Sequence, residues 1–327
     1  MSFKFDFDQE DQEIVQVDNP LNSYNEIIKP KIHLFDEILK SLINIRISYE
    51  NVVLGGISMR RRTIYDVRGQ IMSEDDMSDN GNNSTNFLLS EDDLIKGIYE
   101  GGLKSWECAS DLIEYLESFN IDNNNAIIEM GCGNAMPSIR IIERLIDNQL
   151  NNNGLKIILS DYNYDVLRLV TIPNMILMLM KKINKETFIK LQEDEVIRDE
   201  EIVITESLIK WVEEYLYNNK ISVDLISGGW GNEYVEIIEN STIEYKNRLV
   251  LCSEGIYSND TLPIVAGIVS KLTNGQTDTF IAAKDVYFGV GGSIAVFETW
   301  LQNLQVEYSV KKVGGNGSLS RSIVHCK

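Results

Sequence analysis

The sequence has few of the residues that build disulfide frameworks and metal centres. Its 327 residues include only four cysteines and two histidines, and no two cysteines form a C-x-x-C pair. Disulfide scaffolds and zinc sites both need closely spaced clusters of these residues. The sequence therefore predicts neither disulfides nor a bound metal.

Long apolar runs and a basic leader are also missing. No apolar run approaches the ~20 residues that a membrane-spanning helix needs. The first eleven residues, MSFKFDFDQED, are acidic, whereas a secretory leader begins with a basic region. We therefore expect a cytoplasmic protein that does not bind a membrane. The basic stretch M-R-R-R at 59–62 leaves two interpretations, a nuclear import signal or a solvated basic patch.

Positive charge is scarce. The chain has 30 lysines and arginines against 50 aspartates and glutamates, a formal net charge of −20. Such a polyanion repels a phosphate backbone, so direct nucleic-acid binding is not expected, and a basic protein partner fits better. The alternative is that the acidic residues only solvate mobile segments.

The composition divides the chain into three regions. Residues 1–31 are acidic and lack periodicity, which predicts a largely disordered tail. Residues 32–90 contain a helical pattern from His33 to Arg46 and an acid- and asparagine-rich loop or linker at 72–86. Residues 91–327 hold the main domain, and 43% apolar composition is enough for a substantial core.

Short apolar runs alternate with helical patterns in the main domain. Five runs predict strands, at residues 126–130, 155–161, 223–227, 248–253 and 279–284. This alternation predicts an α/β fold, a parallel sheet with helices on both faces. Two further runs, at 306–311 and 320–325, predict a terminal hairpin.

In such sheets, ligands bind beyond the carboxyl ends of the strands. The first predicted strand leads into I-E-M-G-C-G-N-A-M-P-S, where Gly131 and Gly133 permit a sharp turn close to a ligand. Pro137 supports the start of the next helix. The spacing E-x-G-x-G-x-A lacks the end of a dinucleotide fingerprint and suits S-adenosylmethionine, with Glu129 facing its ammonium group.

The next strand ends add residues to the same rim. Asp161 can accept hydrogen bonds from ribose hydroxyls, and the alternative is that it caps the following helix. The third strand ends in S-G-G-W, which lets the chain pass close to a flat ligand. Trp230 either packs against an adenine or belongs to the core. Ser253 and Glu254 follow the fourth strand.

Several segments together resemble a known family. They are I-Y-E-G-G-L-K-S-W-E-C, E-M-G-C-G-N-A-M-P-S, S-D-Y-N, R-L-V-T-I-P-N, S-G-G-W, S-E-G-I-Y and A-A-K-D-V-Y-F-G-V-G-G-S. The chain from about Glu91 to its end resembles the protein-histidine N-methyltransferases, and its M-S-F-x-F start is similar to fungal members. The resemblance implies a Rossmann-like seven-stranded S-adenosylmethionine methyltransferase sheet of order 3-2-1-4-5-7-6, with strand 7 antiparallel. It makes residues 91–327 the methyltransferase domain and residues 1–90 an N-terminal extension.

The resemblance also implies a cofactor site. Its residues are Ser105, Trp106, Glu107, Cys108, Ala109, Gly131, Gly133, Asp161, Tyr162, Asn163, Gly228, Gly229, Trp230 and Ser253. On this interpretation Trp106 is a cofactor wall rather than only the first core residue of a helix. Two departures stand out. Ala135 replaces a third glycine and is expected to narrow the pocket by a methyl group, and Gly255 stands where relatives often have threonine.

The reaction implied by the family is methyl transfer to a histidine imidazole nitrogen of a ribosomal protein, the third protein of the large subunit. Neutral imidazole, with a reference pKa of ~6.5, is already a nucleophile at cellular pH, so positioning should dominate. Glu254 and Asp285 are the candidates to hold the tautomer and accept the proton. Tyr257, Tyr287 and Phe288 are expected to shape the histidine slot.

Other interpretations remain open at this point. A lysine methyltransferase of the same superfamily would share every cofactor motif and differ only in the acceptor slot. A non-catalytic chaperone of a basic ribosomal protein would use bound cofactor structurally. The loop at 289–293 is either a substrate lip or the turn into the next helix. We expect a monomer.

Overall fold

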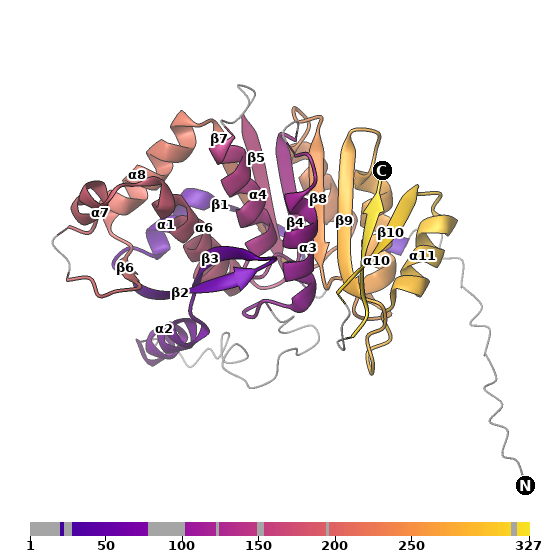
Figure 1. Ribbon diagram of the computed structural model, residues 1–327, viewed down its shortest axis with the longest axis horizontal. Coiled ribbons are helices and arrows are strands. Elements are labelled where there is room, and N and C mark those ends of the chain that lie inside the picture. Colours follow the sequence, from indigo (N-terminus) through magenta and orange to yellow (C-terminus); the bar gives the residue numbers. More distant parts are fainter. Residues whose placement is uncertain are drawn as a thin grey trace, which may run out of the picture.

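The computed structural model describes residues 20–22, 28–77, 102–121, 124–148, 154–193, 196–314 and 319–327. All seven predicted strands are present (Figure 1). They are β4 (Ala126–Met130), β5 (Leu155–Asp161), β7 (Ile221–Ser227), β8 (Arg248–Ser253), β9 (Thr277–Lys284), β10 (Tyr308–Val313) and β11 (Arg321–Cys326).

These strands form one large sheet with an eighth strand, β1 (Lys31–Leu34), in the order β1-β7-β5-β4-β8-β9-β11-β10. Counted along the chain, the seven predicted strands follow one another as 3-2-1-4-5-7-6. Strands β7, β5, β4, β8 and β9 are parallel, whereas β11 runs antiparallel to both β9 and β10. Every residue of β4 and β5 is buried, as expected for strands covered on both faces.

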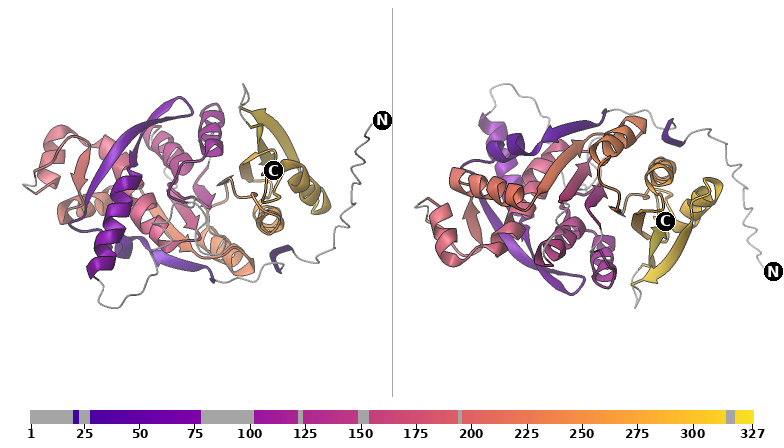
Figure 2. Two further views of the ribbon diagram at one scale, coloured as in Figure 1. Left: turned by 90° about the horizontal axis from the view of Figure 1, so that it is seen from below. Right: turned by 90° about the horizontal axis from the view of Figure 1, so that it is seen from above.

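Helices cover both faces of the sheet, and Figure 2 shows the two layers on either side of it. One face packs against α3 (Glu107–Glu117), α4 (Met136–Asp147) and α6 (Ile172–Leu179), with α1 (Phe35–Ser41) and α8 (Glu206–Asn218) towards one end. The other face packs against α9 (Asn232–Ser241), α10 (Thr261–Leu272) and α11 (Ile294–Asn303).

The shorter helical segments lie mostly in the connections between the large elements. They are η1 (Pro20–Asn22), α5 (Tyr164–Val166), a π-helical stretch (Leu167–Thr171), η4 (Met180–Lys182) and α7 (Lys185–Leu191). The methionine-rich stretch at the end of α6 belongs to the core, because Met175, Met178 and Met180 are all buried.

The region before the main domain differs from its prediction. The expected helix from His33 to Arg46 is wrong at both ends, because His33 lies in β1 and Arg46 begins β2 (Arg46–Leu54). Strand β2 pairs with β3 (Ile57–Arg62) and β6 (Glu201–Val203) in a second, three-stranded sheet. Pairing between distant segments overrides the local helical pattern here.

The acidic stretch after this hairpin also differs in part. Helix α2 (Ile64–Met77) extends into the predicted loop at 72–86, and the remainder of that loop lies outside the described residues. The expected boundary at residues 90 and 91 lies outside them as well. Most of the predicted disordered tail, residues 1–31, also lies outside the described residues. Of the tail, Pro20–Asn22 packs against α10, where Leu21 is 3% exposed, and residues 28–31 are described.

The basic stretch at 59–62 is folded into β3. The Arg62 side chain is fully buried, and that of Arg61 is only 17% exposed. The interpretation as a solvated patch is therefore wrong for both residues, and neither guanidinium is presented to an import receptor. Within the described ranges, no helix is long and apolar enough to cross a membrane.

Candidate functional site

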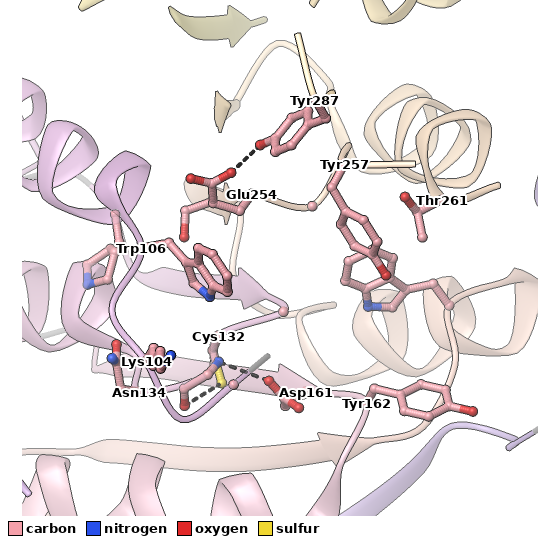
Figure 3. Close-up of a pocket in the computed structure, with 18 of the residues that line it drawn as sticks. Lys104, Trp106, Cys132, Asn134, Asp161, Tyr162, Glu254, Tyr257, Thr261 and Tyr287 are labelled. Carbon is pink, nitrogen blue, oxygen red and sulfur yellow. Dashed lines mark hydrogen bonds between the residues drawn. The ribbon is translucent and has the colours of Figure 1, made fainter. Parts of the chain in front are cut away.

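A cavity of about 290 Å³ opens at the carboxyl ends of β4, β5, β7, β8 and β9. Figure 3 shows the side chains that line it. Thirteen of the predicted site residues lie in its wall. They are Trp106, Ala109, Gly131, Gly133, Asp161, Tyr162, Gly228, Gly229, Trp230, Ser253, Glu254, Tyr257 and Tyr287. The strand ends that the sequence grouped thus meet in one place.

The loop after β4 brings backbone against the cavity. Gly131 and Gly133 have φ angles of 60° and 50°, which side-chain-bearing residues rarely adopt. A Cβ atom on Gly133 would lie 2.9 Å from the carbonyl oxygen of Gly102. Ala135 also has a left-handed φ of 54°, but it is fully buried and does not line the cavity. The expected narrowing by its methyl group is therefore not seen.

Asp161 connects the end of β5 to this loop. Its Oδ2 accepts a hydrogen bond from the Gly133 N–H, and its Oδ1 accepts one from the Asn163 N–H, both at 3.0 Å. The Asp161 carboxylate lines the cavity. The alternative that Asp161 caps the next helix is wrong, because the N-cap of α5 is Asn163 and no described side chain caps that helix. Asn163 itself is buried and does not line the cavity.

The loop after β7 lies against the N-terminal segment. The Gly229 N–H donates to the Ile28 carbonyl at 2.8 Å. A Cβ atom on Gly228 would lie 2.4 Å from the Lys29 carbonyl oxygen. Trp230 lines the cavity and is partly buried against the core, so both interpretations of this residue hold in part. The proximity of residues 28–30 to the site was not predicted.

The segment at 105–109, which leads into α3 and forms its first turn, contributes two of its five predicted residues. Trp106 is the N-cap of α3 and lines the cavity, as does Ala109 one turn later. Cys108 is fully buried, while Glu107 is exposed and pairs with Lys284 at 3.3 Å. Ser105, Glu107 and Cys108 do not line the cavity.

Glu254 is held in a strained conformation at the end of β8. Its φ of 59° is left-handed, a region in which residues other than glycine are uncommon and often functional. Tyr287 donates a hydrogen bond from its hydroxyl to Glu254 Oε2 (Figure 3). Glu254 Oε1 is buried and has no hydrogen-bond partner among the described residues. A buried acceptor of this kind favours a ligand that donates a hydrogen.

The two side chains next to Glu254 that could also act as bases, Tyr287 and Cys108, stay protonated. Burial and the Glu254 charge raise the pKa of the Tyr287 hydroxyl and of the Cys108 thiol, so both stay protonated at neutral pH. Lys284 places its Nζ 4.0 Å from Glu254 Oε1 and over the rings of Trp106 and Tyr287. Of the two predicted bases, Glu254 lines the cavity and Asp285 does not.

Asp285, the second candidate acid, is engaged elsewhere. Its carboxylate accepts hydrogen bonds from Lys312, from Ser320 at 2.6 Å and from Ser322 at 2.6 Å, and it does not line the cavity. Burial alone would raise its pKa, but the hydrogen bonds outweigh burial and lower it. Phe288 also lies outside the cavity wall and is 78% exposed.

Ten residues that line the cavity were not among the predicted cofactor-binding or catalytic residues, although Pro137, Gly255 and the loop that contains Val290 were considered. They are Gly102, Lys104, Cys132, Asn134, Pro137, Gly255, Thr261, Ile264, Lys284 and Val290. Lys284 is the last residue of β9, so the rule of inspecting strand ends was sufficient to find it. Thr261 and Ile264 lie on α10, and no local signal marks that face of a helix as part of a site.

Within the described ranges, no group of three or more histidine, cysteine, aspartate or glutamate side chains is arranged to hold a metal ion. The four cysteines are free and buried.

Two fungal proteins are similar to this chain over most of its length. Histidine protein methyltransferase 1 of Saccharomyces cerevisiae is 39% identical over 334 residues, which cover 94% of this chain and 88% of the relative. The protein of the same name from Schizosaccharomyces pombe is 31% identical and covers 79% of this chain and 73% of the relative. A homologue from Bos taurus is 27% identical over 66% of this chain and 52% of the relative. No protein-family model matches the chain.

Solved structures give a weaker likeness. A methyltransferase from Aquifex aeolicus, described as SAM dependent, covers 66% of this chain and 88% of its own at 7% identity, with a TM-score of 0.34. A protein from Pyrococcus horikoshii covers 68% and 92% at 12% identity, with a TM-score of 0.38. At scores below 0.5 this likeness carries no weight beside the sequence relatives.

Proposed function

This chain belongs to the histidine protein methyltransferase family, and from that premise we propose that its cavity binds S-adenosylmethionine and admits a histidine side chain of a basic ribosomal protein. The observation that carries the proposal is Glu254 Oε1, which is buried in the cavity wall without a hydrogen-bond partner among the described residues and lies 4.0 Å from the Lys284 ammonium. The third protein of the large ribosomal subunit is the acceptor that the sequence resemblance favours. The formal charge of −20 supports a basic partner.

The cavity suits S-adenosylmethionine in the kinds of groups that it offers. Gly131, Gly133 and Gly229 present backbone, Asp161 offers acceptors for ribose hydroxyls, and Trp230 offers an aromatic surface for a base. These residues would hold the nucleoside. When bound, the cofactor supplies a methyl group made reactive by a positively charged sulfur.

Glu129, the predicted partner of the cofactor ammonium, precedes the glycine loop by two residues and does not itself line the cavity. Glu129 is 1% exposed, and its Oε2 accepts a hydrogen bond from the Ser138 N–H at 3.0 Å. Its Oε1 is buried without a hydrogen-bond partner in the described part of the chain. Burial raises the pKa of Glu129 to about 7. A nearby cation would favour the ionised carboxylate and satisfy this oxygen.

The chain's own contribution to the reaction is to orient the acceptor imidazole. Glu254 Oε1 accepts the N–H of one ring nitrogen, which leaves the lone pair of the other nitrogen free to attack the methyl carbon. As the nitrogen–carbon bond formed, the methyl–sulfur bond would break with its electron pair going to the sulfur, which would become a neutral thioether. The ring would be left cationic, and its N–H proton would then pass to the Glu254 carboxylate. Tyr287 holds Oε2 and so fixes the orientation of the carboxylate.

The slot for the histidine side chain lies among aromatic residues. Tyr257 and Tyr287 line the cavity near Glu254. The following loop is pinned to its neighbours, because the Gly292 N–H donates to the Tyr257 carbonyl at 3.1 Å and the Tyr287 N–H donates to the Gly292 carbonyl at 2.8 Å. Val290, in the loop at 289–293, lines the cavity, which supports the interpretation of that loop as a substrate lip.

The acceptor is tested by methyl transfer from labelled S-adenosylmethionine to ribosomal proteins lacking the modification, followed by mass spectrometry of the product. Methylhistidine in the third large-subunit protein is expected. Methylhistidine in another ribosomal protein would overturn that choice of acceptor alone. Methyllysine would overturn the acceptor residue, and cofactor binding without any product would favour the chaperone alternative.

The role of Glu254 is tested by Glu254→Gln, which keeps the shape of the side chain but removes the base. We expect kcat to fall by roughly 10²–10⁴-fold, the usual contribution of general base catalysis, with cofactor affinity unchanged. Glu236→Gln, on the exposed surface of α9, is the matched control. Asp285→Asn distinguishes the two candidate bases. If kcat fell by this amount in Asp285→Asn but not in Glu254→Gln, Asp285 would be the base instead.

A further inference from the structure

A bond from the N-terminal hairpin reaches the wall of the cavity. Arg61, near the end of β3, donates from Nη1 to Ser105 Oγ at 2.8 Å. The same oxygen accepts a hydrogen bond from Asn134 Nδ2 at 2.6 Å. Asn134 follows Gly133 in the loop after β4, is 3% exposed and lines the cavity. Only one side chain therefore separates the Arg61 guanidinium from the wall.

The next residue of β3 reaches Asn134 by a second route. The Arg62 N–H donates to Asn174 Oδ1 at 2.7 Å, and Asn174 Nδ2 donates to the Asn134 carbonyl at 3.0 Å. Asn174 is fully buried on α6. Two consecutive residues of one strand thus hold the side chain and the backbone of the same loop residue.

The orientation of Arg61 is fixed from its other side. Glu50 is its cross-strand neighbour on β2, and Glu50 Oε1 accepts from Arg61 Nη2 at 2.6 Å and from Nε at 3.2 Å. A planar guanidinium can serve Glu50 and Ser105 at once, whereas a lysine ammonium is a single point of charge on a flexible stem. The residue type therefore fits a positioning role.

We infer that Arg61 is a positioning residue for methyl-donor binding, which acts through Ser105 to fix Asn134 and the glycine loop. Arg61 does not line the cavity itself. The inference rests on the proposed function, in which this cavity binds S-adenosylmethionine. It makes the N-terminal hairpin a part of the cofactor site, although the hairpin lies far from the glycine loop in sequence.

The test measures S-adenosylmethionine affinity by calorimetry and steady-state kinetics on the full chain. Arg61→Ala should raise Kd and KM for the donor about tenfold, as expected for the loss of one hydrogen bond to a charged group, with kcat at saturating donor within about twofold. Arg60→Ala is the matched control, because Arg60 precedes Arg61 on β3 and its guanidinium lies over the Tyr49 ring. Its Kd should match the wild type.

A double substitution separates positioning from a general loss of stability. If Arg61 acts through Ser105, the variant carrying both Arg61→Ala and Ser105→Ala should bind no more weakly than the weaker single variant. If the loss of donor affinity in the double variant equals the product of the losses in the two single variants, the two residues act independently and the inference is overturned.

Two further results complete the test. Arg61→Lys keeps a cation opposite Glu50, so it supplies the measurement if Arg61→Ala fails to fold. An unchanged Kd in Arg61→Lys and in any folded Arg61→Ala would overturn the inference. A wild type that does not bind S-adenosylmethionine would instead overturn the proposed function.

Discussion

Glu129 makes stability depend on pH in a direction opposite to most carboxylates. Its pKa is about 7 in the folded chain, raised by burial from an ordinary value of 4.5. Below pH 4.5 the group is protonated in both the folded and the unfolded state. As pH rises from 4.5 to 7, the unfolded chain releases this proton while the folded chain retains it. The stability contributed by Glu129 is therefore lost across that window as pH increases.

The magnitude follows from the shift. A change from 4.5 to about 7 corresponds to about 3 kcal/mol, since each pKa unit is worth 1.36 kcal/mol. Glu129 is 1% exposed, so solvent screens this effect little. Glu129→Gln removes the titration and keeps nearly the same shape. The free energy of unfolding of the wild type, minus that of Glu129→Gln, should fall by about 3 kcal/mol between pH 4.5 and pH 7.5.

The assay is urea unfolding of both chains across that pH range, because the difference cancels every group that titrates alike in the two. Glu236→Gln, at an exposed position, provides the control for the substitution itself. A flat difference for Glu129→Gln would refute the reasoning. It would mean that water or a neighbouring group satisfies the buried carboxylate.

The same titration bears on the proposed ligand contact. If an ammonium group of the ligand lies near Glu129 Oε1, saturating S-adenosylhomocysteine should ionise the carboxylate at lower pH and shift the loss of stability in that direction. If the ligand does not change the pH range over which the stability contributed by Glu129 is lost, Glu129 does not contact the ligand. That result would leave the assignment of Asp161 and the glycine loop untouched.

Three further predictions concern packing, substrate and cofactor. A Cβ atom on Gly255 would lie 2.3 Å from Cys252 Sγ, so Gly255→Ala should lower the free energy of unfolding by about 1–3 kcal/mol, and adding Cys252→Ala should restore part of it. An unchanged urea midpoint in Gly255→Ala would contradict this. Phe288→Asp should raise KM for the protein substrate about tenfold with donor Kd unchanged, whereas Val53→Asp, at another exposed position, should change neither. Asp161→Asn should weaken S-adenosylmethionine binding at least about tenfold in calorimetry, and equal affinity would remove Asp161 from the site.

The sheet was predictable because its strands carry their signal locally. Continuous apolar runs such as 126–130 and 155–161 are buried on both faces, so burial shows directly in the sequence. The carboxyl ends of parallel neighbours must then meet at one edge. That geometric necessity is why the sequence alone groups Asp161, Trp230 and Glu254, although they are far apart in the chain.

The N-terminal elements were not predictable in the same way. Strand β1 owes its conformation to antiparallel pairing with β7, whose sequence lies nearly two hundred residues away. The short strand β6 likewise exists only as the partner of β2. One local signal was present, since the Gly55–Gly56 pair between β2 and β3 is typical of a tight hairpin turn, and both glycines have positive φ angles.

Candidate bases could be proposed from sequence but not ranked. Glu254 and Asp285 both follow strands, and nothing in their local sequence separates them. The difference comes from partners distant in the chain, because Lys312 and Ser320 occupy the carboxylate of Asp285. Glu254 keeps one oxygen without a hydrogen-bond partner among the described residues and lines the cavity.

The placement of the hairpin bears on whether residues 91–327 can work alone. A chain cut at residue 91 would remove Arg62, whose N–H is bonded to the buried Asn174 Oδ1, and leave that acceptor without its partner. It would also remove Arg61 from Ser105 and β1 from the edge of β7. Asn174, Ser105 and β7, which would lose these contacts, all adjoin the glycine loops of the cavity. Unsatisfied buried groups are costly, so we expect the shortened chain to bind S-adenosylmethionine more weakly than the full chain. Equal affinity in calorimetry would show that the glycine loop is held without the hairpin.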